Sequence, residues 1–318
     1  MRNYSTAEDT AAPQVTVVIP AYNAAATVVR AIESVRAQQG VIAEIIVIDD
    51  GSADATHAVV HAHIKGLHFA KLLKMPKNSG VSAARNAGIQ AASSTYLAFL
   101  DADDVWHPGK LASQLARIAA DPDITLVSCN SRLLAPDGTT LKEGHVNRPP
   151  VEGADAWKRL LTYNFIPTPT VLTRTALVRE CGGFNEAMAV GEDLDLWIKL
   201  ATRGKVAVLP EIFVSYYDTA DSLMKRHSGH TGGIVAPMLE QHIKEQCHRL
   251  SNGEIRHIRG YQAFQMGCDL FFSGNHMQSI PQFTKAASHG ARPLKSLLYI
   301  PRALLMRLVH RERRSSTR

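Results

Sequence analysis

The first hundred residues alternate continuous apolar runs with segments of helical spacing, and this alternation limits the possible folds more than any other feature. Runs rich in Val, Ile and Leu lie at 15–20, 44–50, 67–73 and 95–100. Strands that are apolar on both faces are typical of a parallel sheet covered by helices on both sides. The sequence therefore predicts an α/β fold in which a mostly parallel, Rossmann-like sheet is flanked by helices.

The same α/β pattern continues to residue 217. Helical apolar spacing predicts helices at 24–39, 79–94, 107–120, 153–161 and 191–204, and a turn and helix are expected at 51–66. Further strands are expected at 124–128, 168–174 and 206–217.

Beyond about residue 225 the strand patterns disappear and only helical patterns remain. We expect a disordered N-terminus at 1–13, an α/β domain at 14–225 and a smaller all-helical C-terminal region at 226–318. Within this last region, 266–293 has the spacing of one tetratricopeptide-like hairpin, and a basic tail follows it.

The chain of 318 residues carries a formal charge of +6, and most of this charge lies near the C-terminus. Residues 302–318 contain six arginines and one glutamate, so the body of the protein is nearly neutral. It therefore lacks the basic surface expected of a nucleic-acid-binding protein. A basic end beside an apolar helix suits an anionic membrane surface, and we expect peripheral membrane contact through 293–318. A solvated, frayed tail is the alternative.

Cysteine usage and the lack of long apolar segments indicate a cytoplasmic protein. The four cysteines are far apart and form no CxxC pair, which argues against a zinc site and a disulfide framework. Residues 1–13 lack the apolar centre of a signal peptide. No run of about 18 apolar residues occurs, so no membrane span is predicted, and any membrane contact is expected at the inner face.

The stretch LAFLDADDVW ends an apolar run in three carboxylates, Asp101, Asp103 and Asp104. Clustered carboxylate oxygens suit a hard divalent cation such as magnesium or manganese. Turns between a strand and a helix are also rich in aspartate, so Asp103 or Asp104 could instead cap a helix near Trp106. Both interpretations remain open for this motif alone.

Polar residues also follow two other predicted strands, and the carboxyl ends of parallel strands meet at one edge of a sheet. Tyr22 offers a flat face on which a nucleotide base could stack, and a core or rim aromatic is the alternative. The Asp50 carboxylate could accept the imide hydrogen of uracil, or it could form an Asx turn.

Two further segments supply candidate charges. Arg85, early in a predicted helix, could steady a diphosphate or be an ordinary solvated arginine. Glu192 and Asp193 begin another helix, where carboxylates interact favourably with the helix dipole. Gly191 before them would allow a substrate to approach closely, so Asp193 could instead act as a general base on an acceptor hydroxyl.

Five motifs lie in order within residues 14–217. They read VTVVIPAYNA, IIVIDDGSADAT, NSGVSAARNAGI, YLAFLDADDVWHPGKL and GEDLDLWIKL. Together they make the chain resemble the family 2 glycosyltransferases, in which the separation of Asp103 and Asp193 by 90 positions is usual. The resemblance implies the nucleotide-diphospho-sugar transferase fold of type A, and it makes 14–225 the catalytic domain.

The resemblance also implies roles for individual residues. Asp103 and Asp101 would bind a divalent cation, manganese or magnesium, and Asp193 would be the general base, with Glu192 as the next candidate. The nucleotide-sugar site would include Pro20, Ala21, Tyr22, Asn23, Asp50, Arg85, Asp101 and Ala102. A basic segment after the last strand could cover the diphosphate or be an ordinary surface loop; its residues are Lys225, Arg226 and His227.

The activity implied by the resemblance is inverting transfer of a sugar from a nucleotide-diphospho-sugar, usually a UDP-sugar, without a covalent intermediate. The absence of a Q-x-x-R-W motif and of membrane spans favours one sugar per encounter over polymerisation. A glycan or lipid-linked acceptor, in cell-surface polysaccharide or glycolipid synthesis, is expected from the family.

Two other functions compete with sugar transfer. Sugar-phosphate nucleotidyltransferases of this fold usually open with a Gly-rich basic loop, whereas PAYNAAATVVR after the first strand has no glycine. A non-catalytic adaptor could use the helical C-terminal region, but degenerate relatives tend to lose the D-x-D or E-D motif, and this sequence has both.

Overall fold

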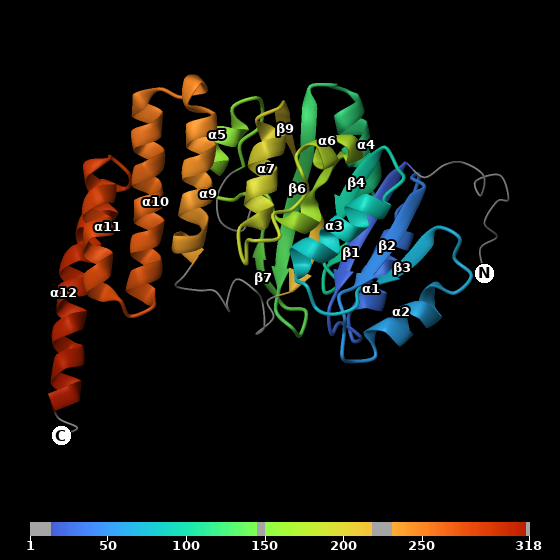
Figure 1. Ribbon diagram of the computed structural model, residues 1–318, viewed down its shortest axis with the longest axis horizontal. Coiled ribbons are helices and arrows are strands. Elements are labelled where there is room, and N and C mark those ends of the chain that lie inside the picture. The colour runs from blue at the N-terminus through green and yellow to red at the C-terminus, as the bar shows by residue number, and fades with distance from the viewer. Residues whose placement is uncertain (1–13, 145–149, 218–230, 316–318) are drawn as a thin grey trace. The chain divides into compact units, whose positions relative to one another are not determined.

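The computed structural model describes residues 14–144, 150–217 and 231–315 (Figure 1). The chain divides into two compact units. The described part of the first comprises 14–144, 150–160, 164–187 and 192–217, and that of the second comprises 161–163, 188–191 and 231–315. The predicted disordered segment 1–13 and the predicted domain boundary at 225/226 lie outside the described residues.

The first unit is built on a single sheet whose strands follow the order β3-β2-β1-β4-β8-β6-β9-β5. Its first half is the parallel group predicted from the apolar runs: β1 (Val15–Ala21), β2 (Ala43–Asp49), β3 (Ala70–Lys74) and β4 (Tyr96–Phe99). All of β1 and nearly all of β2 are buried, as expected of strands that are covered on both faces.

The second half of the sheet mixes strand directions. β8 (Leu172–Arg174) pairs antiparallel with β4 and with β6 (Ile124–Leu134), and β6 pairs parallel with β9 (Lys205–Tyr217). β5 (Val105–Trp106) and β7 (Thr140–Glu143) add short antiparallel pairs. The predicted α/β fold with a mostly parallel sheet is therefore confirmed, with antiparallel pairs made by β5, β7 and β8.

Some strand limits differ from the prediction. The strand expected at 168–174 begins only at Leu172, and Thr168–Thr170 forms a 3-10 turn instead. Pro169 lies in this turn and has no backbone N–H to donate to a neighbouring strand. Elsewhere, β6 continues beyond its expected end at residue 128, and the short strand β5 was not predicted. Residues 206–217 were expected to supply the last strands of this domain, and they form the single strand β9.

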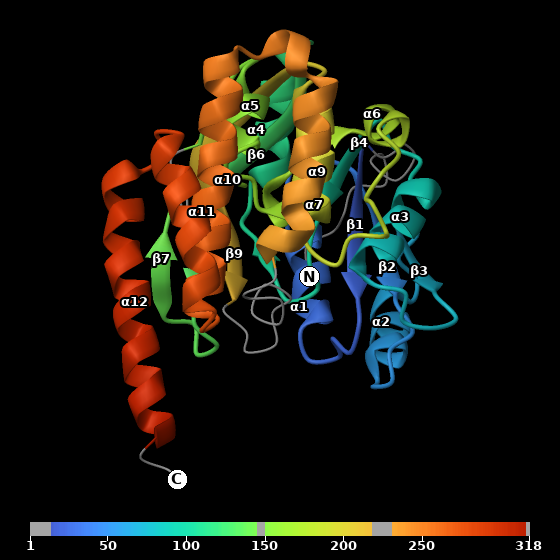
Figure 2. The same cartoon turned by 60° about the vertical axis from the view of Figure 1, so that its left-hand side comes forward.

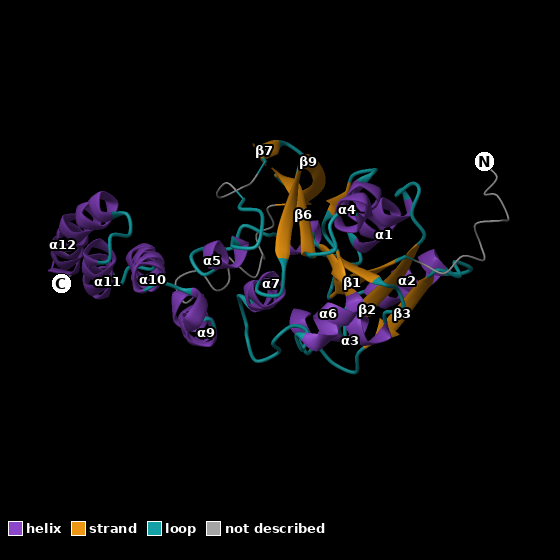
Figure 3. Ribbon diagram, turned by 90° about the horizontal axis from the view of Figure 1, so that it is seen from above, coloured by secondary structure: helices purple, strands orange, loops and turns teal. Residues whose placement is uncertain are grey.

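Helices cover both faces of the sheet (Figure 3). Those of the first unit are α1 (Val28–Arg36), α2 (Thr56–Ile64), α3 (Val81–Ala91), α4 (Lys110–Ala119), α5 (Ala156–Leu160), α6 (Thr175–Glu180) and α7 (Glu192–Ala201). α1 and α4 lie on one face, and α3 and α6 lie on the other. α3 approaches the sheet so closely that a Cβ atom at Gly88 would lie 2.4 Å from Val18, which explains the glycine there.

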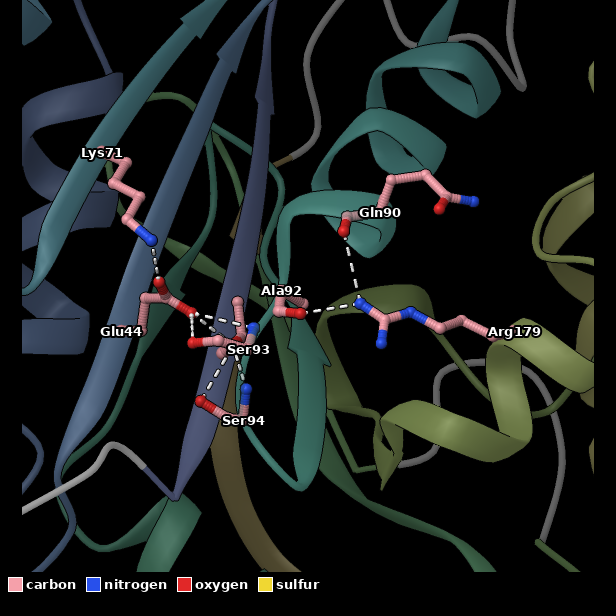
Figure 4. Close-up of polar contacts among 8 residues, drawn as sticks. Glu44, Lys71, Gln90, Ala92, Ser93, Ser94 and Arg179 are labelled. Atoms are coloured by element: carbon pink, nitrogen blue, oxygen red, sulfur yellow. Dashed lines mark hydrogen bonds and ion pairs between the residues drawn. The ribbon is translucent and has the colours of Figure 1, made fainter.

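The amino ends of the parallel strands are tied together by a buried carboxylate (Figure 4). Glu44 of β2 accepts hydrogen bonds from Thr16 Oγ1 at 2.7 Å and from Lys71 Nζ at 2.6 Å. The Ser93 hydroxyl donates to it at 3.1 Å. Nearby, Arg179 of α6 donates to carbonyl oxygens at the end of α3. The buried charge at this edge of the sheet is therefore compensated within the protein.

The second unit is helical (Figure 2). Its elements are α9 (Thr231–Glu245), a 3-10 turn at Cys247–Arg249, α10 (Asn252–Phe272), α11 (His276–Ser288) and α12 (Pro293–Ser315). α10 and α11 form a hairpin in which a Cβ atom at Gly267 would lie 2.8 Å from Phe283. Tyr299 of α12 stacks on the Phe283 ring. No helix among the described residues has the length and apolar character needed to cross a membrane.

Candidate active site

The carboxyl ends of β1 and β2 are joined by short hydrogen bonds that shape the first part of the site. The Asp50 N–H donates to the Ala21 carbonyl at 2.8 Å. Asn23, at φ 50°, accepts from the Ala53 N–H at 2.9 Å through its Oδ1. These bonds bring the predicted nucleotide residues Pro20 to Asn23 beside Asp50.

Asp50 is buried, and each of its carboxylate oxygens accepts a backbone N–H, from Ser79 at 2.8 Å and from Gly80 at 2.9 Å. Burial outweighs these bonds and raises the pKa of Asp50. These bonds do not form the Asx turn considered for Asp50, because Ser79 and Gly80 lie 29 and 30 positions away. The neighbouring Asp49 accepts from the Ser52 N–H at 2.9 Å through its Oδ1. Because a carboxylate oxygen can accept more than one bond, Asp50 can still receive a donor from a ligand.

The side chains before Asp50 differ in what they can offer a ligand. Tyr22 is 48% exposed, so it is not a core aromatic and its ring is accessible for stacking. Pro20 and Ala21 are the last residues of β1 and are buried. Their contribution is therefore to fix the path of the backbone.

The three carboxylates after β4 do not cap a helix. α4 begins at Lys110, its N-cap is Gly109, and no side chain caps it. Asp103 and Asp104 lie in a turn that is closed by the Asp104 N–H, which donates to the Asp101 carbonyl at 3.0 Å. The capping interpretation is therefore wrong, because the chain passes through β5 before α4 begins.

Negative charge accumulates in this turn. Burial raises the pKa of Asp103, and repulsion from Asp101 raises it further. Burial, followed by repulsion from Asp101 and Asp103, raises the pKa of Asp104 well above its ordinary value. Ala102 lies buried between these carboxylates.

A divalent cation fits this turn because it would offset the repulsion between Asp101 and Asp103. Carboxylate oxygens are donors that magnesium and manganese prefer. Among the residues that the structure describes, no group of three His, Cys, Asp or Glu side chains is placed to hold an ion. Water and substrate oxygens would therefore supply much of the coordination, as they usually do for magnesium.

A buried arginine joins the turn after β4 to the start of α7. Arg85 Nη2 donates to Asp101 Oδ1 at 2.8 Å, and Arg85 Nη1 donates to Glu192 Oε1 at 3.0 Å. Burial lowers the pKa of Arg85, but Asp101 and Glu192 raise it by more, so the guanidinium stays charged. The interpretation of Arg85 as a solvated arginine is wrong, because the residue is 4% exposed.

Asp193, in the first turn of α7, has a pKa suited to proton transfer. Burial, followed by repulsion from Glu192, raises the pKa of Asp193 to about 7. Its Oδ2 accepts from Asn164 Nδ2 at 2.9 Å, and its Oδ1 accepts from the Leu194 N–H at 2.7 Å. Both of these hydrogen bonds to Asp193 come from neutral groups, whereas the Glu192 carboxylate forms an ion pair with the positively charged Arg85. A carboxyl group with a pKa near the working pH can both take up and release a proton.

Asn164 is the member of this arrangement that the sequence does not reveal. It lies outside any helix or strand and 29 positions before Asp193. Asparagine is common in such segments for turn reasons, and no local spacing links the two residues. The candidate diphosphate loop, Lys225 to His227, lies outside the described residues.

Comparisons with known proteins place the chain among sugar transferases. Residues 16–179 match the model of the family described as glycosyl transferase family 2. The succinoglycan biosynthesis protein ExoO of Rhizobium meliloti is 36% identical over 222 residues, which cover 67% of this chain and 63% of ExoO. The amylovoran biosynthesis glycosyltransferase AmsB of Erwinia amylovora is 30% identical over 277 residues, which cover 85% of this chain and 88% of AmsB. The chain thus spans less than two thirds of ExoO but most of AmsB.

Two solved structures share the fold. TarS 1-349 of S. aureus, in complex with UDP-GlcNAc, has a TM-score of 0.64 at 18% identity, covering 90% of this chain and 84% of that one. The mannosyltransferase PcManGT from Pyrobaculum calidifontis, in complex with GDP-Man and Mn2+, has a TM-score of 0.58 at 20% identity, covering 93% and 81%. At such identities the likeness establishes the fold alone.

Proposed function

The chain belongs to the family 2 glycosyltransferases, and from this premise we propose that it transfers one sugar at a time, with inversion, from a UDP-sugar to an acceptor hydroxyl. The acceptor is a glycan or a lipid-linked precursor in cell-surface polysaccharide or glycolipid synthesis. The names of ExoO and AmsB, from succinoglycan and amylovoran biosynthesis, support a role in polysaccharide formation. The UDP-GlcNAc held by TarS in the same fold supports a uridine nucleotide.

The observation that carries this proposal is the pair of hydrogen bonds made by Arg85. They fix Asp101, in the turn proposed to face the diphosphate, against Glu192, which directly precedes the proposed base. One buried guanidinium thus connects the donor half of the site with the acceptor half. A merely solvated turn would not require such a connection.

The donor would bind across the carboxyl ends of β1, β2 and β4. Tyr22 would stack on the base, and Asp50 would accept the imide N–H of uracil, a group that cytosine lacks. Two backbone N–H groups hold the Asp50 carboxylate in place, so little side-chain freedom is lost when the base binds.

Asp101 and Asp103 would hold the divalent cation, manganese or magnesium. When bound, such an ion offsets negative charge on a diphosphate leaving group. The PcManGT complex contains Mn2+ in this fold, which supports the assignment. Arg85 would keep Asp101 in place through its hydrogen bond to Oδ1.

Asp193 would act as the general base, with Glu192, which is paired with Arg85, as the next candidate. Asp193 would take the proton of the acceptor hydroxyl as the oxygen forms its bond to the anomeric carbon. The bond from that carbon to the diphosphate oxygen breaks in the same displacement, and the configuration inverts. Asn164 holds the carboxylate oriented through Oδ2.

The proposal is tested by measuring UDP released from a panel of UDP-sugars, with oligosaccharide and lipid-linked acceptors, for the wild type and for D193N. The wild type should turn over at least one donor, and D193N should bind UDP but release almost none from the sugar. If the wild type instead consumes a nucleoside triphosphate with a sugar 1-phosphate, it is a nucleotidyltransferase. If it neither binds nor turns over any nucleotide, the adaptor alternative replaces the proposal.

A further inference from the structure

The last described helix, α12, is apolar on two opposite faces. One face packs within the second unit: Ser296 and Ala303 are fully buried, and Tyr299 contacts the rings of Phe264 and Phe283. The other face carries a row of exposed apolar side chains, which we call the leucine stripe. It consists of Leu294, Leu297, Leu298, Leu304 and Leu305.

The spacing of the leucine stripe places its members on one side of the helix. Intervals of three, four and seven residues recur along 294–305, and residues at these intervals share a helix face. Leu294 is 78% exposed, and Leu298 and Leu305 are each 60% exposed. Single exposed leucines need no explanation, but a contiguous apolar stripe along three turns indicates a binding surface.

The charges beside the stripe indicate what the surface binds. Lys295 and Arg302 are exposed and lie seven residues apart, so they flank the stripe on the same side. Residues 302–318 contain six arginines and one glutamate. An apolar face bordered by cationic side chains is the pattern of helices that lie in a membrane surface. If α12 paired in parallel with α12 of a second copy, the two arginine-rich ends would lie together and repel each other. Anionic lipid headgroups would instead neutralise the charge of these arginines.

We propose that α12 docks the protein onto an anionic membrane surface, with the leucine stripe inserted among the headgroups and Lys295 and Arg302 in contact with lipid phosphates. α12 lies on the surface and does not span it, since no helix of the described residues is suited to crossing a membrane. This inference is independent of the sugar-transfer chemistry and places that chemistry next to lipid-linked molecules.

The test is co-sedimentation of the full chain with vesicles of phosphatidylcholine alone and of phosphatidylcholine mixed equally with phosphatidylglycerol. The wild type should bind the anionic vesicles about ten-fold more strongly, and added salt should weaken this binding. The variant L294Q/L298Q/L305Q should lose about ten-fold or more in vesicle binding. L298Q and L141Q form a matched pair of single variants, because the two leucines are exposed to a similar degree, 60% for Leu298 and 53% for Leu141 in β7. L141Q should bind vesicles as the wild type does.

Circular dichroism and UDP release with a water-soluble acceptor should be unchanged in all these variants. A folded triple variant that binds vesicles as well as the wild type would overturn the proposal, as would a wild type that binds no vesicles. Light scattering tests the other possible occupant of the leucine stripe, a second copy of the chain. A wild type that is a dimer and binds no vesicles, together with a triple variant that is a monomer, would assign the stripe to that second copy.

Discussion

The two edges of the parallel half of the sheet treat their buried carboxylates differently. At the amino edge, burial raises the pKa of Glu44, but hydrogen bonds from Lys71, Thr16 and Ser93 together lower it below its usual value. The negative charge of Glu44 is compensated by donors within the protein. Such a group contributes to stability and leaves no reason for a ligand to bind.

The carboxyl edge is the opposite case. The pKa values of Asp103, Asp104 and Asp193 are all raised, because burial and neighbouring carboxylates outweigh the available donors. Arg85 compensates Asp101 and Glu192, and an excess of negative charge remains. Perturbed carboxyl groups gathered at a strand edge are typical of functional sites, whereas a satisfied one such as Glu44 is typical of structural support.

The largest effect that follows from this comparison is expected at Asp193. D193N should lower kcat for sugar transfer by about 10²–10⁴-fold, the usual contribution of a general base, while the Kd for UDP stays unchanged. Steady-state kinetics with UDP-release detection and calorimetry measure the two quantities. D195N is the control, because Asp195 lies in the same turn but is paired with Lys199 at 2.6 Å. Unchanged transfer by D193N would remove Asp193 as the base.

Removal of divalent cations should have the next largest effect. A chelator is expected to lower transfer by about 100-fold or more, since a bound ion contributes several kcal/mol to catalysis. Manganese or magnesium should restore the rate, and D103N should require a higher ion concentration for half-maximal activity. Full activity of the wild type in excess chelator would show that the crowded turn after β4 does not need an ion.

The pH dependence should report the pKa of Asp193. Below about 7 the carboxyl group is protonated and cannot take the acceptor proton, so kcat/KM should fall about ten-fold per pH unit on that side and level off above it. N164A removes a hydrogen bond that favours the ionised form, so its midpoint should move to higher pH. A profile from pH 5 to 9 for both proteins checks this. An unmoved midpoint in N164A would mean that Asn164 does not position the base.

The smallest effect on activity is expected at the amino edge. E44Q should leave UDP binding and transfer unchanged but lower the free energy of unfolding by about 1–3 kcal/mol, because it weakens bonds to a charged, buried group. D103N is the matched comparison: it removes a repelling charge and should leave stability unchanged or raise it. Urea unfolding of both variants measures the contrast, and a loss of stability in D103N as large as that in E44Q would remove the distinction between the edges.

The sequence predicts what depends on local pattern. The four parallel strands follow from apolar runs of strand length, and the polar residues at their ends follow from the rule that parallel strands end at a common edge. The partners of Arg85 could not be predicted in this way, because Glu192 is 107 positions away. The same holds for Asn164 and Asp193, and for β8, whose antiparallel direction depends on contacts with β4 and β6 rather than on its own three residues.

The most direct test of the account is calorimetric titration with UDP, GDP and CDP, each with and without manganese. If the carboxyl edge is a nucleotide-sugar site, UDP should bind tightly only with the ion present. UDP should be preferred over CDP, because uracil has a ring N–H that can donate to Asp50 and cytosine has none. Absence of nucleotide binding in the presence of manganese would contradict the account, and Asp101 and Asp103 would then belong to a turn with no ligand.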